Sequence, residues 1–104
     1  MNDYLVETLD THGGIQKIYK FENGYGASVI CHDGSYGGPY KKNGPNKWEI
    51  APWDEDKDFI GVNMLEWNDD VKGHLNDPEV DRILRRVQQL WVKHLMNWKL
   101  NCFK

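Results

Sequence analysis

Turn-forming residues are dense in the first two-thirds of this 104-residue chain and absent from its last quarter, and this asymmetry constrains the fold most. Such clusters separate short apolar runs, a spacing typical of antiparallel strands. After Pro78, by contrast, neither Gly nor Pro occurs. The sequence therefore predicts a sheet followed by a long helix. The turn signals are Gly13-Gly14, Asn23-Gly24, Asp33-Gly34, Gly37-Gly38-Pro39 and Asn43-Gly44-Pro45.

Four segments carry strand patterns. Residues 15–22 and 27–32 flank Asn23-Gly24, a dipeptide preferred in tight hairpin turns, so we expect them to pair antiparallel. In the second segment Ala27, Val29 and Cys31 form a fully apolar face, which is expected to meet the core.

Residues 48–52 alternate in the same way, with Pro52 expected at an edge or strand end, and the apolar run 60–67 is interpreted as a fourth strand. Residues 1–14 are left as an N-terminal segment. The predicted fold class is α+β, with a four-stranded antiparallel β-meander over 15–67.

The helix prediction covers 77–100. Asn76 or Asp77 is a good N-cap, Pro78 suits the first helical position, and Glu79 and Asp81 favour the positive end of the helix dipole. An apolar stripe at helical spacing indicates that the helix covers one side of the sheet, and the chain 1–104 is expected to be a single domain. The stripe is Val80, Ile83, Leu84, Val87, Leu90, Trp91, Leu95 and Trp98.

Composition favours a globular protein, since 39% of residues are hydrophobic and 12% aromatic. No apolar run approaches the roughly 20 residues that span a bilayer, and the first ten residues carry acids where a signal peptide carries bases. We therefore expect a cytoplasmic protein that binds no membrane. Cys31 and Cys102 are expected to be free thiols.

No motif for catalysis, a cofactor or a metal is present. The glycines of residues 34–38 lack the phosphate-binding pattern, and no nucleophile has a local signature, so an enzyme is not expected. Asp54, Asp56 and Asp58 alternate as calcium ligands do, but Phe59 and Leu65 occupy the positions that need Gly and Glu. The histidines and cysteines show no common zinc spacing.

Charge is distributed unevenly. Residues 78–104 contain two acidic and six basic side chains, a net charge of +4, which leaves −7 for the rest of a chain whose total is −3. This favours either complementarity between a basic helix and an acidic sheet edge or a binding surface. A nucleic-acid-binding helix face is the alternative function, although the overall acidity argues against it. That face comprises Arg82, Arg85, Arg86 and Lys93.

Aromatic and acidic residues gather between positions 53 and 70. Packing alone accounts for each Trp taken singly, but the combination also suits a protein-binding surface. The candidate residues are Trp53, Asp54, Glu55, Asp56, Asp58, Glu66, Trp67, Asp69 and Asp70.

The predicted helix is too long for the sheet. The whole helix would be about 33 Å long and a strand only about 20 Å, so the end of the helix that carries Trp91, Leu95 and Trp98 would extend beyond the sheet and stay uncovered. We expect them to be buried in a two-fold homodimer or against residues 4–9.

Three stretches carry a resemblance: QKIYKFENGYGASVICHDGSYGG at 16–38, KWEIA at 47–51, and DDVKGHLNDPEVDRILRRVQQL at 69–90. The chain resembles a group of short uncharacterised bacteriophage proteins with a KFENGYGASV hairpin, an SYGG loop and a terminal helix. The loop after Gly38 and the tail from Trp91 depart from that pattern. The resemblance implies an accessory protein in the host cytoplasm and supplies no catalytic residue.

The expected function is therefore non-enzymatic binding of a host protein, with inhibition of a host nucleic-acid enzyme or of an anti-phage defence system as the mode of action. Acidic side chains suit this role because they can imitate a row of phosphates in a basic groove.

Overall fold

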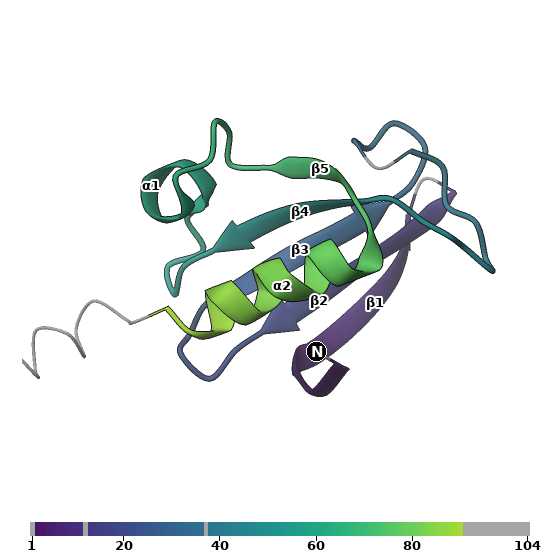
Figure 1. Cartoon of the computed structure of the whole chain (residues 1–104). Coiled ribbons are helices and arrows are strands. Elements are labelled where there is room, and N and C mark those ends of the chain that lie inside the picture. Colours follow the sequence, from purple (N-terminus) through teal and green to yellow (C-terminus); the bar gives the residue numbers. More distant parts are fainter. Residues whose placement is uncertain (1, 12, 37, 91–104) are drawn as a thin grey trace, which may run out of the picture.

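A computed structural model describes residues 2–11, 13–36 and 38–90. Along this part of the chain the order is η1 (Asn2–Tyr4), β1 (Leu5–Thr11), β2 (Gly14–Lys20), β3 (Gly26–Cys31), β4 (Trp48–Trp53), α1 (Gly61–Leu65), β5 (Lys72–Leu75) and α2 (Asp77–Gln88) (Figure 1). The strands form one antiparallel sheet in the order β1-β2-β3-β4-β5. The α+β class is confirmed, but the prediction of four strands was wrong because the meander has five.

The hairpin between β2 and β3 is confirmed. Phe21 N donates to Tyr25 O at 2.8 Å, so three residues form the loop, and Gly24 takes the left-handed conformation with φ of 89°. Glycine adopts this conformation without the steric cost of a Cβ. The pairing places Ala27 opposite Tyr19 and Val29 opposite Lys17.

Two strands were missed. β1 lies within residues 1–14, and most of its residues are exposed because it is an edge strand. β5 contributes only Leu75 to the core and pairs with β4 through Trp48–Leu75 and Ile50–Lys72. Neither strand shows clear alternation, so tertiary pairing rather than local pattern forms them.

The strand predicted at 60–67 was also wrong. Residues Gly61–Leu65 form the one-turn helix α1, which ends where Glu66 adopts φ of 61° and Trp67 N donates to Gly61 O at 2.9 Å. A short apolar run is compatible with either element, so its sequence could not decide between them.

The start of α2 is as predicted. Asn76 is the N-cap, and it forms a capping box with Glu79: each side chain accepts a hydrogen bond from the other residue's backbone N–H, at 2.9 Å and 3.0 Å. Trp48 Nε1 also donates to Asp77 Oδ1 at 2.7 Å, which ties the first turn to β4.

The end of α2 differs from the prediction, because the helix stops at Gln88 rather than near residue 100. Asn23 Nδ2, in the β2–β3 loop, lies 2.9 to 3.0 Å from the carbonyl oxygens of Val87, Gln88 and Leu90. These carbonyls lie at the helix end, where intrahelical partners run out. Residues 91–100 of the predicted helix lie outside the described residues.

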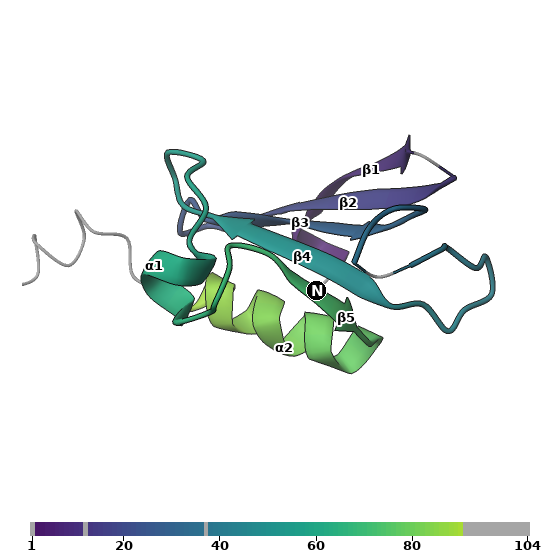
Figure 2. The same cartoon turned by 90° about the horizontal axis from the view of Figure 1, so that it is seen from above.

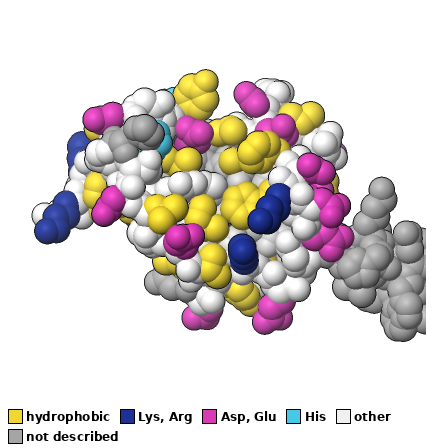
Figure 3. All heavy atoms as spheres, turned by 180° about the vertical axis from the view of Figure 1, so that it is seen from behind, with side chains coloured by type: hydrophobic (Ala, Val, Ile, Leu, Met, Phe, Trp, Pro, Cys, Tyr) yellow, Lys and Arg dark blue, Asp and Glu magenta, His cyan; other side chains and the backbone are white. Residues whose placement is uncertain are grey.

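The elements form two layers. α1 and α2 lie on one side of the sheet, whereas the turn between β4 and α1 projects to the other side (Figure 2). No helix of the described chain covers that second side, which we call the open face (Figure 3). It carries a shallow hollow of about 690 Å³, lined among others by Val6, Leu9, Ile18, Ile30, Trp53 and Phe59.

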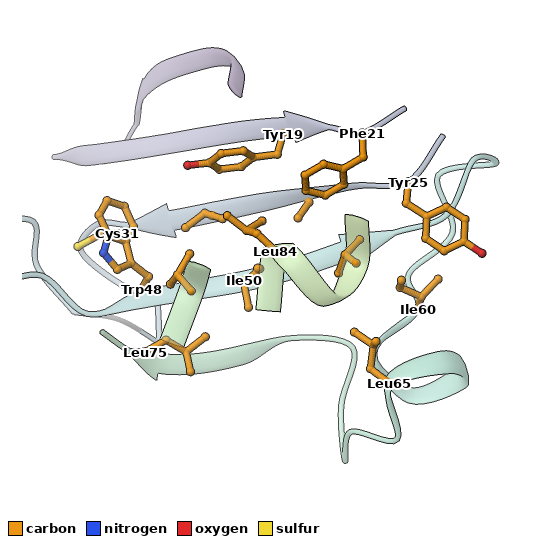
Figure 4. Close-up of a cluster of buried hydrophobic side chains, with 14 residues drawn as sticks. Tyr19, Phe21, Tyr25, Cys31, Trp48, Ile50, Ile60, Leu65, Leu75 and Leu84 are labelled. Atoms are coloured by element: carbon orange, nitrogen blue, oxygen red, sulfur yellow. The ribbon is translucent and has the colours of Figure 1, made fainter. Parts of the chain in front are cut away.

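The core lies between the sheet and α2 (Figure 4). As predicted, Ala27, Val29 and Cys31 face it and are at most 1% exposed. Leu84 from α2 lies over the middle of the sheet, and Ile50 from β4 is fully buried beneath it. The remaining buried hydrophobic residues are Tyr19, Phe21, Tyr25, Trp48, Ile60, Leu65, Leu75, Val80 and Val87.

Pro52 is the penultimate residue of β4, which agrees with the expectation of a strand end. Its carbonyl accepts from Ile60 N at 3.1 Å, on the side away from β3. Because β5 pairs only with Trp48 and Ile50, no ladder partner is lost where Pro52 lacks an N–H.

Candidate functional site

The acidic residues predicted to bind a partner lie at the end of the sheet where β4 finishes. We call residues 54–70 the acidic end: it comprises the turn 54–58, α1 and the loop 66–70. It contains seven carboxylates and a single basic side chain, Lys57, which gives a net charge of −6 over 17 residues. Since the whole chain carries −3, the rest of the molecule is net positive, and the negative charge is concentrated at this end.

The turn 54–58 is organised by its own first carboxylate. Asp54 Oδ1 accepts hydrogen bonds from the backbone N–H groups of Asp56 at 2.9 Å and Asp58 at 3.0 Å. Lys57 adopts a left-handed φ of 66°, and Asp54 N donates to Asp58 O at 2.9 Å. The alternating aspartates therefore belong to a turn. The Asp54 side chain stabilises this turn, whereas Asp56 and Asp58 are exposed.

The loop 66–70 packs closely against the start of α1. A Cβ placed on Gly61 would lie 2.7 Å from Asp69 O and 2.8 Å from the Trp67 ring, so only glycine fits there. Asp70 Oδ1 accepts from Val62 N at 3.1 Å, and Asp69 Oδ1 accepts from Asp70 N at 2.7 Å. Asp70 therefore has a structural role like that of Asp54, and Glu66 is exposed.

Apolar side chains are exposed among these charges. Phe59 is 50%, Val62 48% and Met64 39% exposed. The hydroxyl of the buried Tyr25 lies 3.7 Å from Met64 Sδ. Burial raises the pKa of the Tyr25 phenol above its ordinary value, and the negative charges of Asp54 and Glu55 raise it further.

The structure separates the two predicted tryptophans. Trp53 lies on the open face, where its ring packs over Gly26, whereas Trp67 lies in a different hollow, of about 310 Å³, beside the loop 66–70. Lys72 Nζ lies 5.2 Å from the Trp67 ring centroid. Both indoles are half-buried, so neither is a fully exposed anchor.

Sequence reasoning missed the exposed Val62 and Met64 because it assigned residues 60–67 to a strand, and it considered Phe59 only as a residue that breaks the calcium-loop pattern. It also missed the open face. The available signals were the second sides of the strands 15–22 and 27–32, where Ile18 accompanies Lys20 and Ile30 accompanies Ser28.

The basic residues of the alternative function lie on α2, where Arg82, Arg85 and Arg86 are exposed. Arg85 Nε donates to Asp81 Oδ2 at 2.7 Å, and this hydrogen-bonded pair lowers the pKa of Asp81. Over the described helix, three acidic residues balance three basic ones, so its net charge is zero.

Several predictions concern residues outside the described part of the chain: the residues proposed for a dimer, Trp91, Leu95 and Trp98, as well as Lys93 and Cys102. The N-terminal segment does reach the end of α2. Gln88 Nε2 donates to Tyr4 Oη at 2.9 Å, and the Tyr4 ring packs edge-on against Phe21.

Among the described residues, no group of three or more His, Cys, Asp or Glu side chains is placed to hold a metal ion. The described helices also include none with the length and apolar character needed to cross a membrane. Cys31 carries a free thiol, and burial raises its pKa. Comparisons with protein-family models, with curated proteins and with solved structures gave no match.

Proposed function

We propose that this protein acts by binding another protein through its acidic end rather than by catalysis. One observation carries the proposal: exposed Phe59, Val62 and Met64 lie within a segment of net charge −6. Apolar side chains supply contact area, and the carboxylates speed encounter with a basic partner and orient it. The partner surface that fits is therefore basic with an apolar centre.

The resemblance to short bacteriophage proteins supports a bacterial host protein as the partner. A nucleic-acid enzyme, or a defence protein that handles nucleic acid, has a basic groove of the required kind. In that groove the exposed carboxylates of the acidic end would take the place of phosphates. The protein would then act as an inhibitor in the host cytoplasm.

The structure indicates which carboxylates to change. Asp54 and Asp70 accept backbone hydrogen bonds that hold their loops, so their removal would confound folding with binding. Asp56, Asp58 and Glu66 are exposed. A triple variant, Asp56→Asn, Asp58→Asn and Glu66→Gln, removes three charges and leaves those loop contacts in place.

The experiment is a pull-down from bacterial lysate, followed by binding kinetics with the captured protein. We expect the triple variant to associate on the order of tenfold more slowly at low salt, and the difference to shrink as salt rises. A matched control, Asp3→Asn, Asp10→Asn and Asp33→Asn, removes the same charge from exposed positions elsewhere. Equal effects of the two triple variants, or capture of no protein, would contradict the proposal.

The described α2 gives no support to nucleic-acid binding, because its net charge is zero and Arg85 is engaged by Asp81. We therefore do not propose that function.

A further inference from the structure

We propose that the chain's own residues 91–104 cover the acidic end in the free protein, with the exposed side of α1 as their docking surface. The inference rests on the proposed function, because it concerns the regulation of the surface that would bind a basic partner. A host protein would then have to displace this segment before it could bind. Residues 91–104 lie outside the described residues and follow directly on Leu90, two positions beyond α2.

The described chain stops beside the acidic end. Asn23 Nδ2, in the β2–β3 loop, lies 2.9 Å from Leu90 O. The next residue of the loop, Gly24, packs against the turn 54–58, because a Cβ placed on it would lie 3.0 Å from Glu55 Cβ. α1 and the end of α2 also lie at the same end of the sheet and on the same side of it (Figures 1 and 2). A segment that continues from Leu90 therefore starts next to this surface.

α1 presents apolar side chains among carboxylates. Val62 is 48% and Met64 39% exposed. Asp70 Oδ1 accepts from Val62 N at 3.1 Å, and Tyr25, which follows Gly24 in the loop, has its hydroxyl 3.7 Å from Met64 Sδ. Burial raises the pKa of this phenol, and two carboxylates of the turn raise it further, so negative charge is close by. A segment that fits here needs apolar side chains and positive charges.

The segment 91–104 has this composition. It contains three lysines and no acidic residue, a net charge of +3, which faces −6 at the acidic end. Half of its residues are large and apolar. The lysines are Lys93, Lys99 and Lys104, and the large apolar residues are Trp91, Val92, Leu95, Met96, Trp98, Leu100 and Phe103.

Charge also distinguishes the acidic end from the open face. The open face is apolar as well, but the four charged residues that line its hollow, Glu7, Lys20, Glu49 and Lys57, sum to zero. It therefore gives a basic segment no electrostatic preference. At the acidic end, by contrast, no other described residue forms an ion pair with Asp56, Asp58 or Glu66.

Covalent connection makes a small contact sufficient. Fourteen residues span about 21 Å as a helix and up to about 46 Å when extended, which is ample for a site that begins beside Leu90. A short connection gives an effective concentration on the order of millimolar, so a contact with a Kd of about 0.1 mM would be closed in about 90% of molecules. A partner that binds only the remaining open molecules would show an apparent affinity about tenfold weaker.

A spin label on Cys102 of the full chain tests the docking without any host protein. The label should attach at this one position, because Cys31 is fully buried. We expect it to broaden the backbone amide NMR signals of Val62 and Met64 far more than those of residues 40–47, at the other end of the sheet. The broadening should weaken as salt rises, because salt screens the attraction between lysines and carboxylates.

Variants of the docking surface test whether the contact is specific. Val62→Lys places a positive charge on the exposed side of α1 and should abolish most of the broadening, whereas Val6→Lys adds the same charge on the open face and should leave it unchanged. The triple variant Asp56→Asn, Asp58→Asn and Glu66→Gln should also reduce the broadening. Its matched control, described above, should not.

Regulation is tested with the host protein captured in the pull-down. Neutralising the three lysines of the segment 91–104 to Gln should raise the apparent affinity about tenfold, because the acidic end is then released. The control Lys41→Gln, Lys42→Gln and Lys47→Gln removes the same charge from exposed positions between β3 and β4 and should change the affinity much less. Equal effects of the two lysine variants would refute the regulatory role.

Other results would overturn the docking itself. Val62 and Met64 signals no broader than those of residues 40–47 would exclude it, and broadening of residues 4–9 instead would place the segment against the N-terminal strand. Mixing spin-labelled chains with isotope-labelled chains that lack the spin label should give no broadening; if it does, the occupant is a second copy. Docking without capture of any host protein would sustain this inference and contradict the proposed function, whereas capture without docking would do the reverse.

Discussion

Replacing Asn23 with Ala tests whether the β2–β3 loop terminates α2. The Asn23 amide nitrogen has two N–H groups and lies 2.9 to 3.0 Å from three carbonyl oxygens at the helix end. Its Oδ1 accepts from Tyr25 N at 3.0 Å. Two donated bonds and one accepted bond, at about 1 kcal/mol each, give an expected loss of about 3 kcal/mol in the free energy of unfolding.

A loss of this size is large for a domain of about 100 residues, whose total stability is on the order of 5–15 kcal/mol. It should lower the melting temperature by roughly 15 °C. Chemical denaturation followed by far-UV circular dichroism measures the free energy directly. Glu22→Ala is the matched control, because Glu22 is exposed in the same loop, and its effect should stay within about 0.5 kcal/mol.

Asn23→Asp separates the two kinds of bond. It keeps the acceptor for Tyr25 N, removes the donors, and puts a negative charge beside the negative end of the helix dipole. At neutral pH it should therefore lower the free energy of unfolding about as much as Asn23→Ala does. Below a pH of about 4 the loss should be smaller, because a protonated carboxyl can donate a hydrogen bond again. If Asn23→Ala costs no more than Glu22→Ala, the loop does not terminate the helix.

Three further predictions concern single residues. The pKa of Tyr25 is raised by burial and by neighbouring carboxylates, so its contribution to stability is fully present below about pH 10 and is lost as pH rises through the higher folded value. Denaturation curves from about pH 8 to about pH 11 should therefore show a smaller alkaline loss in Tyr25→Phe, and an unchanged loss would contradict this. Gly26→Ala should destabilise the fold by about 2 kcal/mol, because the new methyl would lie 2.5 Å from Tyr19 O and 2.8 Å from the Trp53 ring, and a neutral effect in thermal denaturation would refute that packing. In a Cys102→Ser background, the buried Cys31 thiol should react with Ellman's reagent at least about a hundredfold more slowly in native protein than in denaturant, and rapid native labelling would show that it is accessible.

The parts of the fold that were predictable are those whose signals are local. The β2–β3 hairpin follows from Asn23-Gly24 between alternating segments, and the start of α2 follows from Asn76, Pro78 and Glu79. Their partners lie within a few residues along the chain. The side of β3 that faces the core was also predictable, because its apolar residues alternate along the strand with a mixed set.

The rest depends on contacts between distant residues. The end of α2 carries no stop signal of its own, since its capping residue lies 64 to 67 positions earlier in the sequence. β5 forms along the edge that β4 offers, and the helical turn of α1 is fixed by the cap at Glu66 and by the loop 66–70 that packs against Gly61.

The candidate site divides in the same way. Its charge was visible in the sequence, but the exposure of Phe59 and Val62 and the separation of Trp53 from Trp67 required the structure.

α2 follows all five strands in the sequence, and this order has a consequence for folding during synthesis. Each strand pairs with its neighbours in sequence, so the meander can begin to assemble as the chain emerges from the ribosome, N-terminus first. The side of the sheet that carries Val29 and Ile50 can be buried only after Leu84 and Val87 of α2 have been synthesised. Until then the nascent sheet presents bare hydrophobic surface on both sides, and this interval is when the chain is most exposed to chaperones, proteases and aggregation.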